Sequence, residues 1–191
     1  MYEENDPYSF GEEARAEYEQ AGTRLLIVPP TALTRKDGRS QWSEFVTVTD
    51  IQFIEAEKAL KNPEQKGDLC FGLNFTFDVA PESQVDGQPT RNSGRRIYST
   101  ARYNMSAYKR EKLRSGDFRK GQASMTQRTN GFIKSLLLGL GMDTDLGLSP
   151  KRIVDEKESF IGQKVWAKIV QGKDKNDYER TEVDGFIPEE A

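Results

Sequence analysis

Residues 69 to 79 alternate between apolar and polar or small side chains, and this pattern constrains the fold more than any other feature of the chain. The apolar positions are Leu69, Phe71, Leu73, Phe75, Phe77 and Val79, and the positions between them are Cys70, Gly72, Asn74, Thr76 and Asp78. Successive side chains of a strand point to opposite faces, so this run predicts a strand with one buried face. The chain must therefore contain a sheet that buries several aromatic rings.

Other segments complete a mainly β pattern with one long helix. Strands are expected at 24–28, 42–54, 163–170 and 178–187, and 95–105 is a further strand candidate inside a long connection. Residues 80–94 are expected to form a flexible loop, because they contain Pro81, Gly87, Pro89 and Gly94. Apolar residues at three- and four-residue spacing predict a helix over 124–141, which ends at Gly141.

The order of these elements suggests an architecture. Five strands with the helix between the third and fourth strands is the order of an OB fold, a five-stranded Greek-key barrel that binds oligonucleotides. A β-sandwich, or another small barrel with a packed helix, has the same order along the chain. We therefore expect an acidic N-terminal arm (1–22), an OB-like domain (23–188) with a basic insertion at about 80–121, and a short acidic tail (189–191).

Charge is distributed unevenly, although the formal net charge is only −3. Residues 1–22 carry a net −6, residues 91–134 a net +10, and residues 177–191 a net −5. A basic centre of this size favours a polyanionic ligand, and the acidic ends can shield that centre or bind another partner. A solvated basic surface is the alternative interpretation.

Several classes of site are excluded by composition. The chain has no histidine and one cysteine, Cys70, so it lacks His-dependent nucleophile pairs, histidine zinc sites, cysteine-only zinc sites and an internal disulfide. The acidic groups Asp143 with Asp145, and Asp155 with Glu156 and Glu158, have neither metal-loop spacing nor a nearby phosphate-binding glycine loop. We expect no enzyme activity, no cofactor and no metal. No apolar run is long enough to span a membrane, and a cytoplasmic location is expected.

Three features point to nucleic acid. The basic block contains interspersed tyrosines, Trp166 lies between Lys164 and Lys168 on one face of an expected strand, and loop 172–178 would join the last two strands of an OB fold. Arginine and lysine bind phosphates, and aromatic rings stack on bases of any sequence. An edge tryptophan and an ordinary hairpin turn are the alternatives. The candidate nucleic-acid-binding residues are Trp42, Arg95, Arg96, Tyr98, Arg102, Tyr103, Lys109, Arg110, Lys164, Trp166, Lys168, Lys173, Lys175 and Tyr178.

Four segments also carry a resemblance to a known family. They are AGTRLLIV, GRRIYSTARYN, FIKSLLLGLG, and the closing FIGQKVWAKIV with YERTEVDGFIP. The chain resembles a family of phage proteins that are encoded near recombination and replication genes and are treated as single-stranded-DNA-binding proteins or OB-fold relatives of them. The resemblance implies a cytosolic, non-enzymatic protein that coats single strands in an infected cell.

The leading hypothesis is therefore a sequence-tolerant single-stranded-DNA-binding protein in phage replication or recombination. DNA and RNA are not distinguished by these features, and a replication or recombination protein could bind the acidic segments. The alternative is a non-enzymatic viral adaptor, or a nucleic-acid mimic, that binds a protein through its acidic arm. A metal-dependent nuclease built on carboxylates is the third hypothesis.

Overall fold

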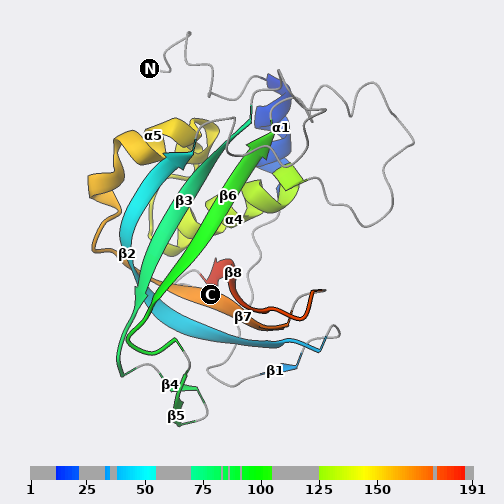
Figure 1. Ribbon diagram of the computed structural model, residues 1–191. Coiled ribbons are helices and arrows are strands. Elements are labelled where there is room, and N and C mark those ends of the chain that lie inside the picture. Colours follow the sequence, from blue (N-terminus) through cyan, green and yellow to red (C-terminus); the bar gives the residue numbers. More distant parts are fainter. Residues whose placement is uncertain are drawn as a thin grey trace.

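The long strand β2 (Ser40–Ile54) organises the sheet, because it pairs with three other strands. In the computed structural model (Figure 1), its C-terminal half pairs with β3 (Cys70–Val79) and its N-terminal half with β7 (Lys164–Lys173) and the short β1 (Leu33–Thr34). Farther out, β3 pairs with β6 (Arg96–Asn104), and β7 pairs with β8 (Glu179–Ile187). The structure describes residues 12–21, 33–34, 38–54, 70–82, 84–85, 87–90, 92–104, 125–173 and 176–187.

The sheet is antiparallel and nearly closed. Its strand order is β6-β3-β2-β7-β8, and the two outer strands β6 and β8 approach each other without forming a ladder in the described part of the chain. A register shift between Val48 and Asp50 lies in the middle of β2, where a bulge increases strand bending. The result is a mainly β chain with a five-stranded barrel-like sheet, compatible with an OB-like barrel.

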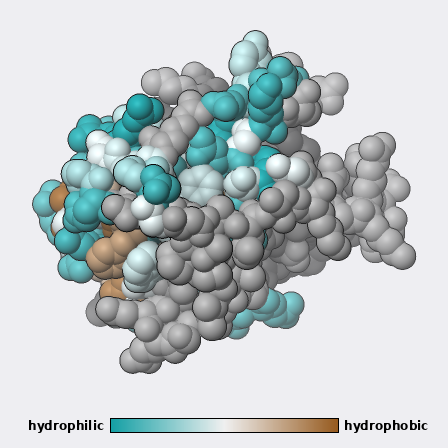
Figure 2. Space-filling model, turned by 90° about the horizontal axis from the view of Figure 1, so that it is seen from below, coloured by the Kyte–Doolittle hydropathy of each residue, from teal (hydrophilic) through white to brown (hydrophobic). Residues whose placement is uncertain are grey.

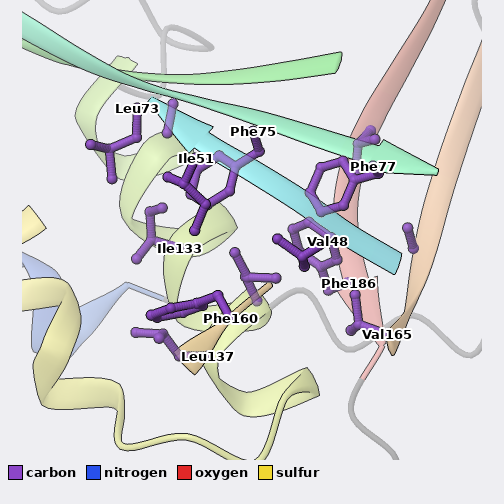
Figure 3. Close-up of a cluster of buried hydrophobic side chains, with 14 of the residues drawn as sticks. Val48, Ile51, Leu73, Phe75, Phe77, Ile133, Leu137, Phe160, Val165 and Phe186 are labelled. Carbon is purple, nitrogen blue, oxygen red and sulfur yellow. The ribbon is translucent and has the colours of Figure 1, made fainter. Parts of the chain in front are cut away.

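The predicted alternation in β3 is confirmed by its burial. Phe71, Leu73, Phe75 and Phe77 are fully buried, while the residues between Leu73 and Val79 on the other face are partly exposed. Figure 3 shows three of the buried side chains of β3 close to residues of β2 and of the helix α4 (Met125–Gly139): Leu73, Phe75 and Phe77 lie near Val48, Ile51, Ile133 and Leu137. Burying each such side chain contributes about 1.5–3 kcal/mol relative to leaving it in water, so this face of β3 is a major part of the core.

Helix α4 covers the gap between β6 and β8. It contacts both strands, and the Thr129 hydroxyl donates a hydrogen bond of 2.7 Å to the Arg102 carbonyl oxygen of β6. Its buried residues Ile133, Leu136 and Leu137 agree with the predicted apolar stripe. A cavity of about 140 Å³ remains between the helix and the two strands.

The acidic N-terminal segment contains the short helix α1 (Glu12–Gln20), which docks on α4 and on the 3-10 helix η2 (Thr144–Leu148). Tyr18 is buried, and its hydroxyl donates to the Thr144 carbonyl oxygen at 2.5 Å. The Lys134 ammonium lies within 3.0–3.4 Å of three carbonyl oxygens at the end of α1, from Tyr18 to Ala21. A cation at this position stabilises the negative end of the helix dipole.

The predicted strands 42–54, 69–79, 163–170 and 178–187 are each present within a few residues, and the candidate 95–105 is the sheet strand β6. The segment expected to be a loop, 80–94, contains two short strands, β4 (Gln84–Val85) and β5 (Gln88–Pro89), which pair as a hairpin. Helix α5 (Pro150–Asp155) and the 3-10 helix η3 (Lys157–Ser159) were not predicted, because such short elements have little periodicity. The expected strand 24–28 lies outside the described residues.

Candidate nucleic-acid interface

The side of β6 and β3 away from the core carries polar and charged residues in register with one another. Ile97, Ala101 and Tyr103 point inward, so Arg96 and Tyr98 point outward. Arg96 pairs with Asp78 of β3, Asp78 with Thr47 of β2, and Thr47 with Lys164 of β7. Neighbouring strands are about 4.8 Å apart, so this row crosses about 14 Å of sheet with a cation at each end.

Aromatic rings lie beyond this row in two places. Tyr98 is 59% exposed on β6, while Phe45 and Trp166 are each 40% exposed on β2 and β7. Phe45 and Trp166 are opposite each other in the ladder, with ring centroids 5.1 Å apart and planes tilted by 38°. We call Phe45 and Trp166 the aromatic pair. The outer face is the surface formed by the aromatic pair with Lys164, Thr47, Arg96 and Tyr98.

The outer face includes an open hollow beside Tyr98. Its volume is about 610 Å³, and its lining includes Thr47, Asp78, Arg95, Arg96 and Tyr98. The Arg96 Nε donates to the Asp78 Oδ1 at 3.0 Å, and the Asp78 carboxylate raises the pKa of the Arg96 guanidinium. This bond engages only one edge of the guanidinium group. Arg95 and Arg96 therefore bring two cations to a hollow that also presents an aromatic ring.

Two residues of the predicted site are buried in the core. Trp42 is only 7% exposed, and the Tyr103 ring stacks on Phe71 with centroids 4.6 Å apart. Both residues occupy inward positions of their strands, Trp42 in line with Val46 and Tyr103 in line with Ala101. Neither ring offers a free face to a base, so neither belongs to the outer face.

Lys168 is also unavailable at the surface. It lies on the polar side of β7, as predicted, but it is buried, and its ammonium lies 2.8 Å from the Asp184 carboxylate of β8. A register shift between Lys168 and Ile169 lies at this point of the β7–β8 ladder. Its charge is thus neutralised by a residue of the neighbouring strand, and the residue spacing within one strand does not reveal such a pairing.

The remaining predicted residues are distributed over three places. Lys173 forms an exposed ion pair of 3.0 Å with Asp177, and Tyr178 is well exposed after the turn between β7 and β8. Arg102 is partly buried near the start of α4. Lys109, Arg110 and Lys175 lie outside the described residues.

Sequence reasoning missed Phe45 and Asp78 as members of this surface. The inward positions of β2 are Trp42, Glu44, Val46 and Val48. Phe45 lies between two of them, so the alternation of the strand marks it as an outward aromatic residue. Asp78 occupies a polar position of β3, but its role depends on the register with Arg96. The first could have been found from periodicity, while the second needed the strand pairing.

Neither a metal site nor a membrane-spanning helix is found within the described ranges. These residues contain no group of three or more His, Cys, Asp or Glu side chains placed to hold a metal ion. No helix among them is long and apolar enough to cross a membrane. Figure 2 shows one side of the molecule, where the described surface is mostly hydrophilic with a small hydrophobic group.

Comparison of the chain with protein-family models, with curated proteins and with solved structures finds no match in any of the three.

Proposed function

We propose that the chain is a sequence-tolerant single-stranded-DNA-binding protein of phage replication or recombination, built on an OB fold. The strand order supports this fold, since β2 pairs with both β3 and β7 and α4 follows β6 in the chain. In this assignment β6 is the third strand and β7 the fourth. The helix then lies between the third and fourth strands, and the expected strand 24–28 is not one of the five.

The observation that carries the proposal is the composition of the outer face. Exposed aromatic rings stand at both ends of it, Arg96 and Lys164 supply cations between them, and Arg95 lines the adjoining hollow. Phosphates of a bound strand would contact these cations and release counterions, while bases would stack on Tyr98 and Trp166. Stacking requires only the face of a base, which explains tolerance of sequence.

The same arrangement favours single strands over duplex. In a duplex the faces of the bases are already stacked on one another, so Tyr98 and the aromatic pair would have nothing to stack on. From strand spacing and rise per residue, the two aromatic positions are about 15–20 Å apart. A strand advances at least about 3.4 Å per nucleotide, so this distance corresponds to at most about four to six nucleotides. That length is at the short end of the sites used by OB folds.

The test is a titration of a labelled oligo-dT of about thirty nucleotides, followed by anisotropy and by tryptophan fluorescence at two salt concentrations. Because Trp42 is buried and Trp166 is exposed, quenching reports on Trp166. We expect tight, salt-sensitive binding with quenching, and loss of the quenching in Trp166→Phe. Equal affinity for duplex of the same length, or no binding at low salt, would refute the proposal.

The docked helix α1 favours a second candidate, an adaptor that binds a basic protein through its acidic arm. Tyr18 and Lys134 hold α1 on α4 and η2, which places this helix of the arm at a defined position. Replacing Glu3, Glu4, Glu12 and Glu13 with glutamine keeps Tyr18 in place and removes four charges. In the adaptor, binding of a basic probe such as polylysine falls with this change. In the DNA-binding protein, oligo-dT affinity is retained or improved.

A further inference from the structure

The turn before β6 determines where Arg95 and Arg96 stand. The Arg95 amide donates to the Asn92 carbonyl oxygen at 2.9 Å, and the Gly94 amide donates to the Val79 carbonyl oxygen at 3.1 Å. Gly94 has a φ of +69°, a left-handed conformation that favours glycine. The two arginines follow this glycine directly and line the hollow beside Tyr98.

A buried glutamate holds this turn from the other side. Glu44 of β2 is 1% exposed and lies on the inward side of the strand. The Thr90 hydroxyl donates to one of its carboxyl oxygens, and the Asn92 side-chain amide lies 3.5 Å from the other. The Thr90 amide donates to the Ser93 hydroxyl at 2.9 Å, and the Asn92 amide donates to the Thr90 hydroxyl oxygen at 3.2 Å. We call Glu44, Thr90, Asn92 and Ser93 the clasp.

Stability of the fold alone does not explain a glutamate at the buried position 44. Taking a carboxyl group out of water is costly even when it is hydrogen-bonded, and apolar replacements of buried charged groups are often as stable. The neighbouring inward positions of β2 are Trp42 and Val46, both of which are apolar. What the carboxyl group adds, and an apolar side chain would not, is a directional bond to the turn.

We propose that Glu44 is a positioning residue of the DNA-binding surface: through Thr90 and Asn92 it fixes the turn that presents Arg95 and Arg96 together to a phosphate backbone. The inference rests on the proposed function and extends it to a residue with no contact to the ligand. Without the clasp the barrel remains, but the turn no longer holds Arg95 and Arg96 in place at the hollow.

The test is a double-mutant cycle on oligo-dT binding. The variants are Thr90→Val, Glu44→Gln and Arg95→Ala/Arg96→Ala, and the readout is the slope of log K against log salt concentration. Each phosphate contact on a single strand contributes about 0.7 to this slope, so removing both arginines should lower it by about 1.4. Over a fourfold rise in salt, that change equals about a sevenfold smaller loss of affinity.

We expect Thr90→Val to lower the slope toward the value of the arginine variant, and to have no further effect when combined with it. Glu44→Gln keeps the volume and one acceptor oxygen, so an intermediate slope is expected. Ser135→Ala is the matched control, because its buried hydroxyl bonds within α4 to the Gly131 carbonyl oxygen. Its slope should equal that of the unmodified protein, even if its unfolding midpoint falls.

Two results would overturn the inference while leaving the proposed function in place. The first is an unchanged slope in both folded clasp variants. The second is an effect of Thr90→Val that adds fully to that of the arginine variant. Absence of salt-sensitive binding in the unmodified protein is a different outcome, because it refutes the proposed function itself. Circular dichroism confirms that each variant is folded before it is scored.

Discussion

Gly147 is the residue on which the docking of α1 depends, and Gly147→Ala is the change that tests it. A Cβ atom at this position would stand 2.5 Å from Cζ and 2.7 Å from Cε2 of the Tyr18 ring, and closer still to its hydroxyl oxygen. These separations are far below van der Waals contact, and the ring is enclosed. Tyr18 must therefore leave its site when alanine is present.

The expected change in the free energy of unfolding follows from the interactions that Tyr18 loses in Gly147→Ala. Exposing a buried side chain of this size costs about 1.5–3 kcal/mol. The hydrogen bond to the Thr144 carbonyl oxygen adds about 0.5–1.5 kcal/mol. We expect Gly147→Ala to lower the free energy of unfolding by about 2–4 kcal/mol, which for a chain of this length is about 5–15 °C in the unfolding midpoint. Tyr18→Phe removes only the hydrogen bond and should cost about 1 kcal/mol.

The assay combines thermal unfolding with limited trypsin digestion at Arg15, which lies within α1. When cleavage requires undocking, its rate follows the undocked population, which rises tenfold per 1.4 kcal/mol. Cleavage after Arg15 should accelerate by about thirtyfold or more in Gly147→Ala, as measured by mass spectrometry. An unchanged cleavage rate together with an unchanged midpoint would refute this account of α1 docking.

Three further predictions concern the barrel and its outer face. Trp166→Ala should weaken oligo-dT binding by about 5- to 150-fold, because stacking on one base contributes about 1–3 kcal/mol. Its control, Trp42→Phe, should retain the fluorescence quenching on titration. Lys164→Gln should lower the salt slope by about 0.7, measured over the same salt series. Lys168→Met should leave binding intact but destabilise the fold by about 3–5 kcal/mol in chemical denaturation, because it leaves Asp184 partly buried without its cation.

The main strands and the helix α4 could be predicted because their periodicity reflects burial directly. The alternation in β3 and the stripe containing Ile133 and Leu137 each describe one face of one element. The same rule applied strictly would have removed Tyr103 from the candidate site, since it shares the side of β6 that carries Ile97 and Ala101. Tyr103 is among the candidate residues because its neighbours are basic, but the charge of its neighbours does not determine which side of the strand Tyr103 occupies.

The features that sequence could not provide depend on pairing between distant strands. Lys168 is neutralised by Asp184, which lies on β8 beyond a register shift. Glu44 meets Thr90 across 46 positions of the chain, and Tyr18 meets Thr144 across 126. A polar residue in a strand pattern can be solvated, paired or buried, and only its partner decides which.

The position of α1 bears on how the acidic and basic parts of the chain act together. An acidic segment that shields the outer face would have to lie on it, yet α1 contacts α4 and η2. Helix α4 packs on the core side of the sheet through Ile133 and Leu137, whereas Arg96 and Tyr98 of the outer face point away from the core. The docked residues 12–21 therefore leave Arg96 and Tyr98 uncovered. If both proposed surfaces operate, DNA and a protein partner can occupy the chain at once, and release of α1 by Gly147→Ala should leave oligo-dT affinity unchanged.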